Sequence, residues 1–223
     1  MWSSRAETAA EYSVAGSELR LTIPTGQGLW CAEEHDPPLR VSGIQSGVWS
    51  GPAGGTRGQQ PFREGLTVRE FQPAQSGWTP HYGLLEVRAR MDLSPRSMAG
   101  VWMVGLEDEP ERSAEILIFE VFGKAVRPGS AEVGIGVRPF RDPAITGEFE
   151  APRLALDPAE PHVYAADWRP GRVDFLVDGE RVKTIDEAPD YPMQMMVALF
   201  DFPGRPGPGD HVPELAIDYV REG

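Results

Sequence analysis

The sequence has only one cysteine, which excludes an internal disulfide. Cys31 has no second thiol to pair with among the 223 residues. The stability of the fold is therefore predicted not to depend on an oxidising compartment. We expect a buried or inert thiol at this position.

Basic residues are scarce, and long hydrophobic runs are absent. Lys and Arg number 21 against 34 Asp and Glu, a net charge of −13, which argues against partners such as nucleic acid or an anionic membrane. No apolar run approaches the roughly 18 residues of a membrane span, and no basic-then-apolar leader is seen. The simplest expectation is a cytoplasmic protein, although a trimmed secretion signal would leave the same pattern.

Sustained helical periodicity is lacking too, and segments with a period of two take its place. Leu84–Met91 and Glu214–Val220 alternate apolar and polar residues, as strands with one buried face do. Arg172–Ile185 places Asp178-Gly179 between two alternating runs, which predicts a hairpin. Many short strands between turn signals are typical of an all-β sandwich. Further strands are expected at Leu19–Ile23, Leu66–Gln72, Val101–Leu106, Glu115–Phe122, Glu132–Val137, Val163–Trp168 and Gln194–Asp201.

Glycine and proline are spread along the chain. The 25 glycines and 22 prolines do not gather in one linker, so residues 1–223 are predicted to form a single domain. Gly47–Gly65, which contains SGPAGGTRGQQP, is predicted to be a long loop. Long loops on a sandwich often shape a binding site.

Two glutamates interrupt the apolar stretch AEILIFEVFG. Buried carboxylates are costly unless they are paired, hydrogen-bonded or used in chemistry. Glu115 and Glu120 are five residues apart, so in a regular strand they point to opposite faces. One extra residue, inserted as a bulge, would bring them to the same face. Their carboxyls could then approach the ~5–5.5 Å typical of retaining glycosidases.

Several segments, in order, resemble glycoside hydrolase family 16, the laminarinase and β-glucanase group. The segment EILIFE falls where that family carries ExDxxE. HVYAADWRPGRVDFLVDGERV is similar to its HxYxxEWxPxxIxxYVDG hairpin. The matching segments are His81–Met91, Gly100–Gly105, Glu115–Glu120, His162–Val182, Tyr191–Leu199 and Ile217–Glu222.

The resemblance implies a β-jelly-roll sandwich of two curved antiparallel sheets with a concave ligand groove. It assigns Glu115 as the nucleophile and Glu120 as the general acid/base of a retaining mechanism. The expected substrate is a β-linked glucan or a related polysaccharide. The two roles require different pKa values, low for the nucleophile and raised for the acid.

Three positions depart from the family pattern. Leu117 replaces the middle Asp of ExDxxE, so Glu115 is expected to lose a hydrogen-bonding partner and to favour its neutral form. Met98 stands where relatives commonly carry tryptophan, and Ala198 where they carry asparagine. The groove is therefore expected to be more apolar than a glucan groove.

Six further side chains are candidates for substrate binding. The resemblance implies that Trp102 and Trp168 stack on sugar rings, although core packing explains buried aromatics equally well. It also places His162 at a cleft position. Trp49 and Trp78 lie in loop-like stretches, where an exposed tryptophan often marks binding. Tyr82, next to His81, is a candidate groove residue.

No resident metal or cofactor is expected. The four histidines are not spaced as metal ligands. Some relatives bind calcium at the position of Asp218, but one carboxylate is a weak basis for an ion that takes six to eight oxygens. The acidic run Glu107–Glu111 is predicted to be a solvated loop.

Three hypotheses remain open from the sequence. The first is an enzyme that hydrolyses or transglycosylates a β-linked glycan through Glu115 and Glu120. The second is a carbohydrate-binding jelly roll whose catalysis is lost at Leu117. The third is an enzyme that reuses the groove and one glutamate on a small apolar ligand.

Overall fold

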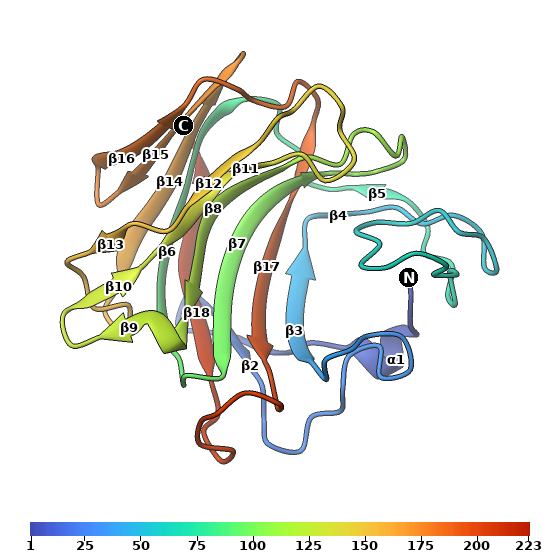
Figure 1. The fold of residues 1–223 in the computed structure, drawn as a ribbon, viewed down its shortest axis with the longest axis horizontal. Coiled ribbons are helices and arrows are strands. Elements are labelled where there is room, and N and C mark those ends of the chain that lie inside the picture. Colours follow the sequence, from blue (N-terminus) through green and yellow to red (C-terminus); the bar gives the residue numbers. More distant parts are fainter.

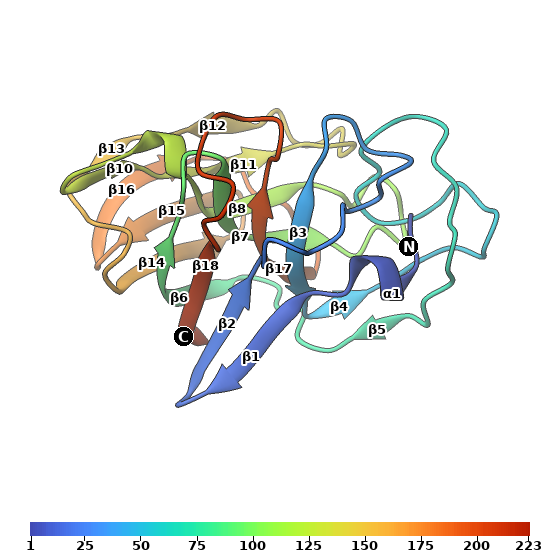
Figure 2. The ribbon, with the colours of Figure 1, turned by 90° about the horizontal axis from the view of Figure 1, so that it is seen from below.

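Two large antiparallel sheets form the body of the computed structural model, which describes residues 1–223, and a three-stranded and a two-stranded sheet accompany them (Figure 1). The seven-stranded sheet has the order β1-β2-β18-β6-β14-β15-β16, and the six-stranded sheet has the order β12-β11-β8-β7-β17-β3. Figure 2 shows them as two layers, with the β1–β2 hairpin at the edge of the lower one. The predicted all-β sandwich is confirmed.

The bounds of the elements are as follows. The seven-stranded sheet contains β1 (Glu11–Ala15), β2 (Glu18–Thr22), β6 (Gly83–Asp92), β14 (His162–Arg169), β15 (Arg172–Val177), β16 (Glu180–Ile185) and β18 (Glu214–Glu222). The six-stranded sheet contains β3 (Arg40–Gln45), β7 (Ser97–Gly105), β8 (Glu115–Phe122), β11 (Gly134–Arg138), β12 (Glu148–Glu150) and β17 (Met193–Asp201). The short elements are α1 (Arg5–Thr8), β4 (Gly47–Val48), β5 (Gln75–Ser76), η1 (Gly123–Ala125), β9 (Val126–Arg127), β10 (Ser130–Glu132) and β13 (Arg153–Leu154).

The main core lies between the two sheets, because each sheet turns its apolar side chains toward the other. Strand β6 buries Leu85, Val87, Ala89 and Met91, the four residues that share one face by the period of two. Strands β7, β8, β14 and β17 contribute in the same way to a cluster of 34 buried residues. The outer face of the six-stranded sheet is thereby left for a ligand.

The predicted hairpin between β15 and β16 is present. Asp178 and Gly179 have φ values of 51° and 82°, as a two-residue turn with both central residues in the left-handed region requires. Such backbone torsions favour Asn, Asp and Gly over other residues. The dipeptide therefore determines where the chain reverses.

The prediction of a strand at Leu66–Gln72 is wrong. Leu66 and Val68 are buried alternately, as a strand would bury them, but against a small satellite cluster with Trp2 and Cys31. The backbone of Val68 pairs with loop residues Gly54 and Gly55, so no ladder forms. The alternation of apolar and polar residues correctly predicted which side chains are buried. It did not predict which backbone groups this segment pairs with.

Cys31 is buried in that satellite cluster, as predicted. Burial raises the pKa of its thiol to about 11, so the thiolate that reacts is scarce near neutral pH. The cluster joins the N-terminus to the loops that precede and follow β3, beside the six-stranded sheet (Figure 1).

Gly179→Ala is expected to destabilise the protein by about 1 kcal/mol, because a Cβ disfavours the left-handed region. A Cβ at Gly179 meets no atom within 4 Å, so the effect isolates the backbone. Gly204→Ala is a matched control, with open space but no positive φ. Urea unfolding of both variants measures the difference, and equal stabilities would contradict the assignment.

Candidate active site

A bulge in β8 brings Glu115 and Glu120 to one face of the sheet. On the β7 side, Phe119 pairs with Val101 but Leu117 pairs with Trp102, so one residue of β8 is left over. The pairing with β11 shows the same excess, since Glu120 and Leu117 are three apart while their partners are two apart. The extra residue restores a shared face for the two glutamates. Both line the groove on the outer side of the six-stranded sheet.

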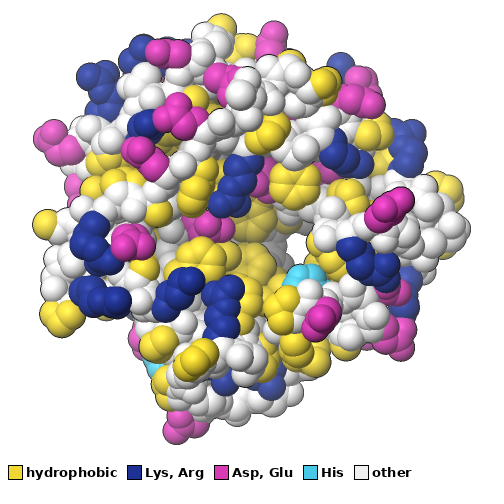
Figure 3. Space-filling model, viewed as in Figure 1, with side chains coloured by type: hydrophobic (Ala, Val, Ile, Leu, Met, Phe, Trp, Pro, Cys, Tyr) yellow, Lys and Arg dark blue, Asp and Glu magenta, His cyan; other side chains and the backbone are white.

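The floor of this groove is a row of very small residues beside Glu120. Strand pairing places Gly100 next to Glu120, Ala198 next to Gly100, and Gly43 next to Ala198. The missing side chains leave a hollow of about 400 Å³, visible at the centre of Figure 3. A ligand can therefore approach the backbone of the central strands closely.

The walls of the groove are mainly apolar, as predicted from Met98 and Ala198. Hydrophobic residues account for 17 of the 28 that line it. Trp102 and Leu117 stand on one side of the small-residue row, and Met98 and Phe200 stand on the other. Polar recognition must therefore come from a few side chains.

One guanidinium lies beside both glutamates. Arg138 Nη2 is 3.2 Å from Glu120 Oε2, and Arg138 Nη1 is 3.9 Å from Glu115 Oε2. The same guanidinium lies 4.4 Å from the ring centroid of Phe149, which holds it over the strand. The two carboxylates therefore flank the same guanidinium.

Glu115 is the more buried of the pair, with 5 % of its surface exposed. Burial raises its pKa to about 7, and the negative charges of Glu120 and Glu107 act in the same direction. Arg138 and a hydrogen bond of 2.6 Å from Gln60 Nε2 oppose this rise. The balance favours the protonated form of Glu115 up to near neutral pH, the direction expected from the sequence. That Leu117 contributes to this shift stays a prediction.

A second buried acid stands behind the first. Glu107 accepts a hydrogen bond of 2.7 Å from the backbone N–H of Gln60, and it pairs with Arg141. Burial raises its pKa to about 7. The prediction of a solvated loop is therefore wrong for Glu107, which anchors the loop residue that in turn contacts Glu115.

Two of the predicted aromatic residues line the groove. Trp102 lies on its wall next to Leu117, and Trp49 comes from the long loop predicted to shape the site. The guanidinium of Arg57 lies 5.2 Å from the ring centroid of Trp49. Stacking of these rings on a sugar stays a prediction, but their positions allow it.

Trp168 and Tyr82 do not reach the groove, which overturns their prediction as sugar-binding residues. Trp168 is fully buried in the main core, and its Nε1 donates to the Pro189 carbonyl at 3.1 Å. Tyr82 packs edge-on against Trp168, with ring centroids 5.1 Å apart, and its hydroxyl donates to Asp190. Both belong to the side of the seven-stranded sheet, which the core separates from the groove.

His162 and Trp78 are also outside the groove, contrary to the prediction. His162, on β14, lies 2.7 Å from Asp178 at the hairpin of β15 and β16. Trp78 packs against the main core, and its Nε1 donates to Glu222 at 3.0 Å. Periodicity shows which residues share a face, but it does not show which sheet carries the groove.

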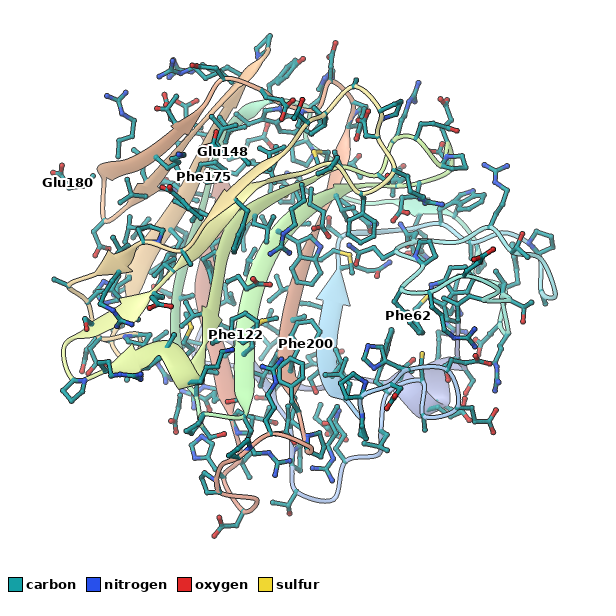
Figure 4. The ribbon with its side chains drawn as sticks, in the orientation of Figure 1. Phe62, Phe122, Glu148, Phe175, Glu180 and Phe200 are labelled. Carbon is teal, nitrogen blue, oxygen red and sulfur yellow. The ribbon has the colours of Figure 1, made fainter.

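Several groove residues are not predictable from a sequence motif. Arg138 and Gln60 carry no motif, and only the fold brings them to the glutamates. Trp30, His35 and Phe62 form an aromatic cluster on the groove, with ring centroids 5.0–5.5 Å apart. Figure 4 shows Phe62 across the opening from Phe200. The aromatic residues of these loops were the one sequence feature that could have indicated a binding surface.

Asp218, the candidate calcium ligand, is paired with Arg88. A calcium ion there would have to compete with this guanidinium, and calcium binding stays a prediction. No group of three or more His, Cys, Asp or Glu side chains is arranged to hold a metal ion. None of the helices has the length and apolar character needed to cross a membrane.

Comparison with solved structures supports the fold. The GlcNAcα1-4Gal releasing endo-β-galactosidase from Clostridium perfringens is 27% identical, with a TM-score of 0.78 over 96% of this chain and 53% of that one. The β-glucanase of Bacillus licheniformis is 18% identical, with a TM-score of 0.59 over 95% of this chain and 81% of that one. The laminarinase from Flavobacterium sp. UMI-01 is 16% identical, with a TM-score of 0.59 over 94% and 80%.

The chain thus spans about half of the length of the Clostridium enzyme. No sequence among the curated proteins matches it. The family model for glycosyl hydrolases family 16 matches residues 66–204, which is more than half of the chain and includes both glutamates. Together with the jelly-roll fold of the matching structures, this shows that the chain belongs to glycosyl hydrolases family 16.

Proposed function

We propose that the protein is a retaining glycosidase that cleaves a β-linked glycan. The observation that carries this proposal is the position of Glu115 and Glu120 beside one guanidinium in an open groove. Retaining enzymes need two carboxyls ~5–5.5 Å apart, one as the nucleophile and one as the acid/base. Two carboxylates that flank Arg138 Nη1 and Nη2 support the presence of such a pair.

In the proposed reaction, Glu115 attacks the anomeric carbon of the bound sugar. The bond from that carbon to the glycosidic oxygen breaks, and Glu120 gives its proton to the departing oxygen. Glu120, now ionised, then takes a proton from a water molecule that displaces Glu115 from the sugar. Arg138 supports the first step, because its charge favours the ionised form of Glu115.

We propose a β-galactoside-containing glycan as the first substrate class to test, with β-glucan as the second. The 27% identity to the Clostridium endo-β-galactosidase favours galactosides. Met98 and Ala198, which line the groove where the family resemblance implies tryptophan and asparagine, are a second reason to test substrates other than β-glucan.

A second candidate function is glycan binding without turnover. The favouring observation is the raised pKa of Glu115, about 7, beside Leu117. A neutral carboxyl is a poor nucleophile, so such a protein would keep its groove but lose the first chemical step.

Glu115→Gln and Glu120→Gln are each expected to lower the hydrolysis rate of β-galactoside and β-glucan oligosaccharides by about 10²–10⁴-fold. Glu180→Gln is the matched control, because Glu180 is exposed on the β15–β16 hairpin, far from the groove (Figure 4). Release of reducing ends measures the rates. Unchanged turnover in both groove variants would exclude the proposed mechanism.

The hydrolysis rate of the wild type is expected to rise as the pH increases through about 7, since Glu115 must lose its proton to attack. Leu117→Asp should change the pH at which the hydrolysis rate increases, because a carboxyl beside Glu115 changes the protonation of Glu115. Leu117→Asn, similar in size but uncharged, is the control. A wild type that binds oligosaccharides without hydrolysing them, together with an active Leu117→Asp variant, would instead support the second candidate function.

Stability should fall as the pH rises from about 4.5 to about 7. In this interval the folded state keeps the proton on Glu115 while the unfolded state, with the ordinary value of 4.5, releases it. In Glu115→Gln the free energy of unfolding should decrease by about 1–3 kcal/mol less over this pH interval than in the wild type. Urea unfolding from pH 4.5 to 8 measures the slope. A slope in Glu115→Gln equal to that of the wild type and of Glu180→Gln would contradict the burial argument.

A further inference from the structure

The acidic chain carries two cations that have no ion-pair or hydrogen-bond partner. Of the 21 Lys and Arg side chains, 17 form ion pairs, and Arg57 and Arg127 donate to backbone carbonyls. Only Lys124 and Arg205 have neither a carboxylate nor a hydrogen-bond acceptor. With 34 carboxylate side chains available, this is an unusual exception.

The two cations contact the same aromatic ring, next to the groove. Lys124 Nζ and the guanidinium carbon of Arg205 are each 5.4 Å from the ring centroid of Phe122. Arg205 also covers Phe202 at 3.8 Å. Such contacts hold a cation by the ring face and leave its N–H groups free to bind an anion.

This margin is continuous with the groove. Met98 on β7 pairs with Phe122 on β8 and with Phe200 on β17, so the three side chains form one row across the sheet. Met98 and Phe200 line the groove itself, and Phe200 stacks near Phe202, with centroids 6.4 Å apart. We call Phe122, Lys124, Phe200, Phe202 and Arg205 the basic margin. Figure 3 shows Lys and Arg side chains beside the hydrophobic rim of the hollow.

The neighbouring acid cannot neutralise these cations. Asp201 at the end of β17 already binds Arg96 at 2.6 Å and Arg40 at 3.1 Å. Arg205 Nη1 is shielded from solvent and has no hydrogen-bond partner. No protein acceptor therefore satisfies this guanidinium, and its charge is not neutralised within the chain.

We propose that the basic margin binds an anionic substituent, a sulfate ester or a carboxylate, on a sugar held in the groove. The inference rests on the proposed function in that it places a glycan there. Lys124 and Arg205 would donate charge-assisted hydrogen bonds to the substituent oxygens, while Phe200 would contact the sugar ring. A neutral glycan would gain only the aromatic contacts.

The test compares binding of lactose, 3′-sulfated lactose and 3′-sialyllactose to the Glu120→Gln protein by calorimetry. The three share one core and differ in having no anion, a sulfate or a carboxylate. We expect at least about tenfold tighter binding of one or both anionic sugars than of lactose, weakened by added salt. In a Lys124→Gln/Arg205→Gln variant the ratio should fall to about one.

Arg181→Gln, which removes an exposed cation on the seven-stranded sheet, should leave the ratio unchanged. Tighter binding of the sulfated sugar alone assigns a sulfate site, and tighter binding of both assigns a general anion site. Equal affinities in the wild-type margin, a ratio that survives the double substitution, or no binding of either anionic sugar would overturn the proposal. This test measures binding without turnover. A wild type that hydrolyses no glycan would therefore contradict the proposed function but not this inference.

Discussion

A strand shows the same face only at every second residue, and this constraint governs the whole site. Glu115 and Glu120 are separated by five positions, so without the extra residue in β8 one of them would point into the core between the sheets. The bulge adds that residue without ending the strand, since pairing with β7 and β11 resumes on both sides of it. One local irregularity thereby converts two isolated carboxylates into a pair.

The burial of that pair has consequences for charge. Glu115 and Glu107 both lie beneath the surface, and burial raises the pKa of each to about 7. Arg138 and Arg141 offset part of this effect, and Gln60 connects the two acids through its backbone and its side chain. Two buried carboxylates held this way reduce stability at neutral pH. A site that must bind and transform a substrate offers a physical reason to retain them.

The groove combines apolar walls with polar groups in a few places. Its floor of Gly43, Gly100 and Ala198 is open, so a ligand can lie close to the sheet. Charge enters at Arg138 in the centre and at Lys124 and Arg205 on the margin. In a chain with a net charge of −13, such positions are where an anionic group can be held.

Local rules determined much of this protein from the sequence alone. Period-two alternation located most strands, and Asp178-Gly179 predicted a hairpin. The five-residue spacing of Glu115 and Glu120 showed that they could share a face only if the strand contains a bulge. Tertiary structure decided what alternation cannot encode: which sheet carries the groove, and hence that Trp102 lines it while Trp168 lies in the core. It also brought Gln60 and Arg138 to Glu115 from distant positions in the chain. The physical reason is that a side chain's face is set by its neighbours in sequence, whereas its partners are set by strands that pair across the whole chain.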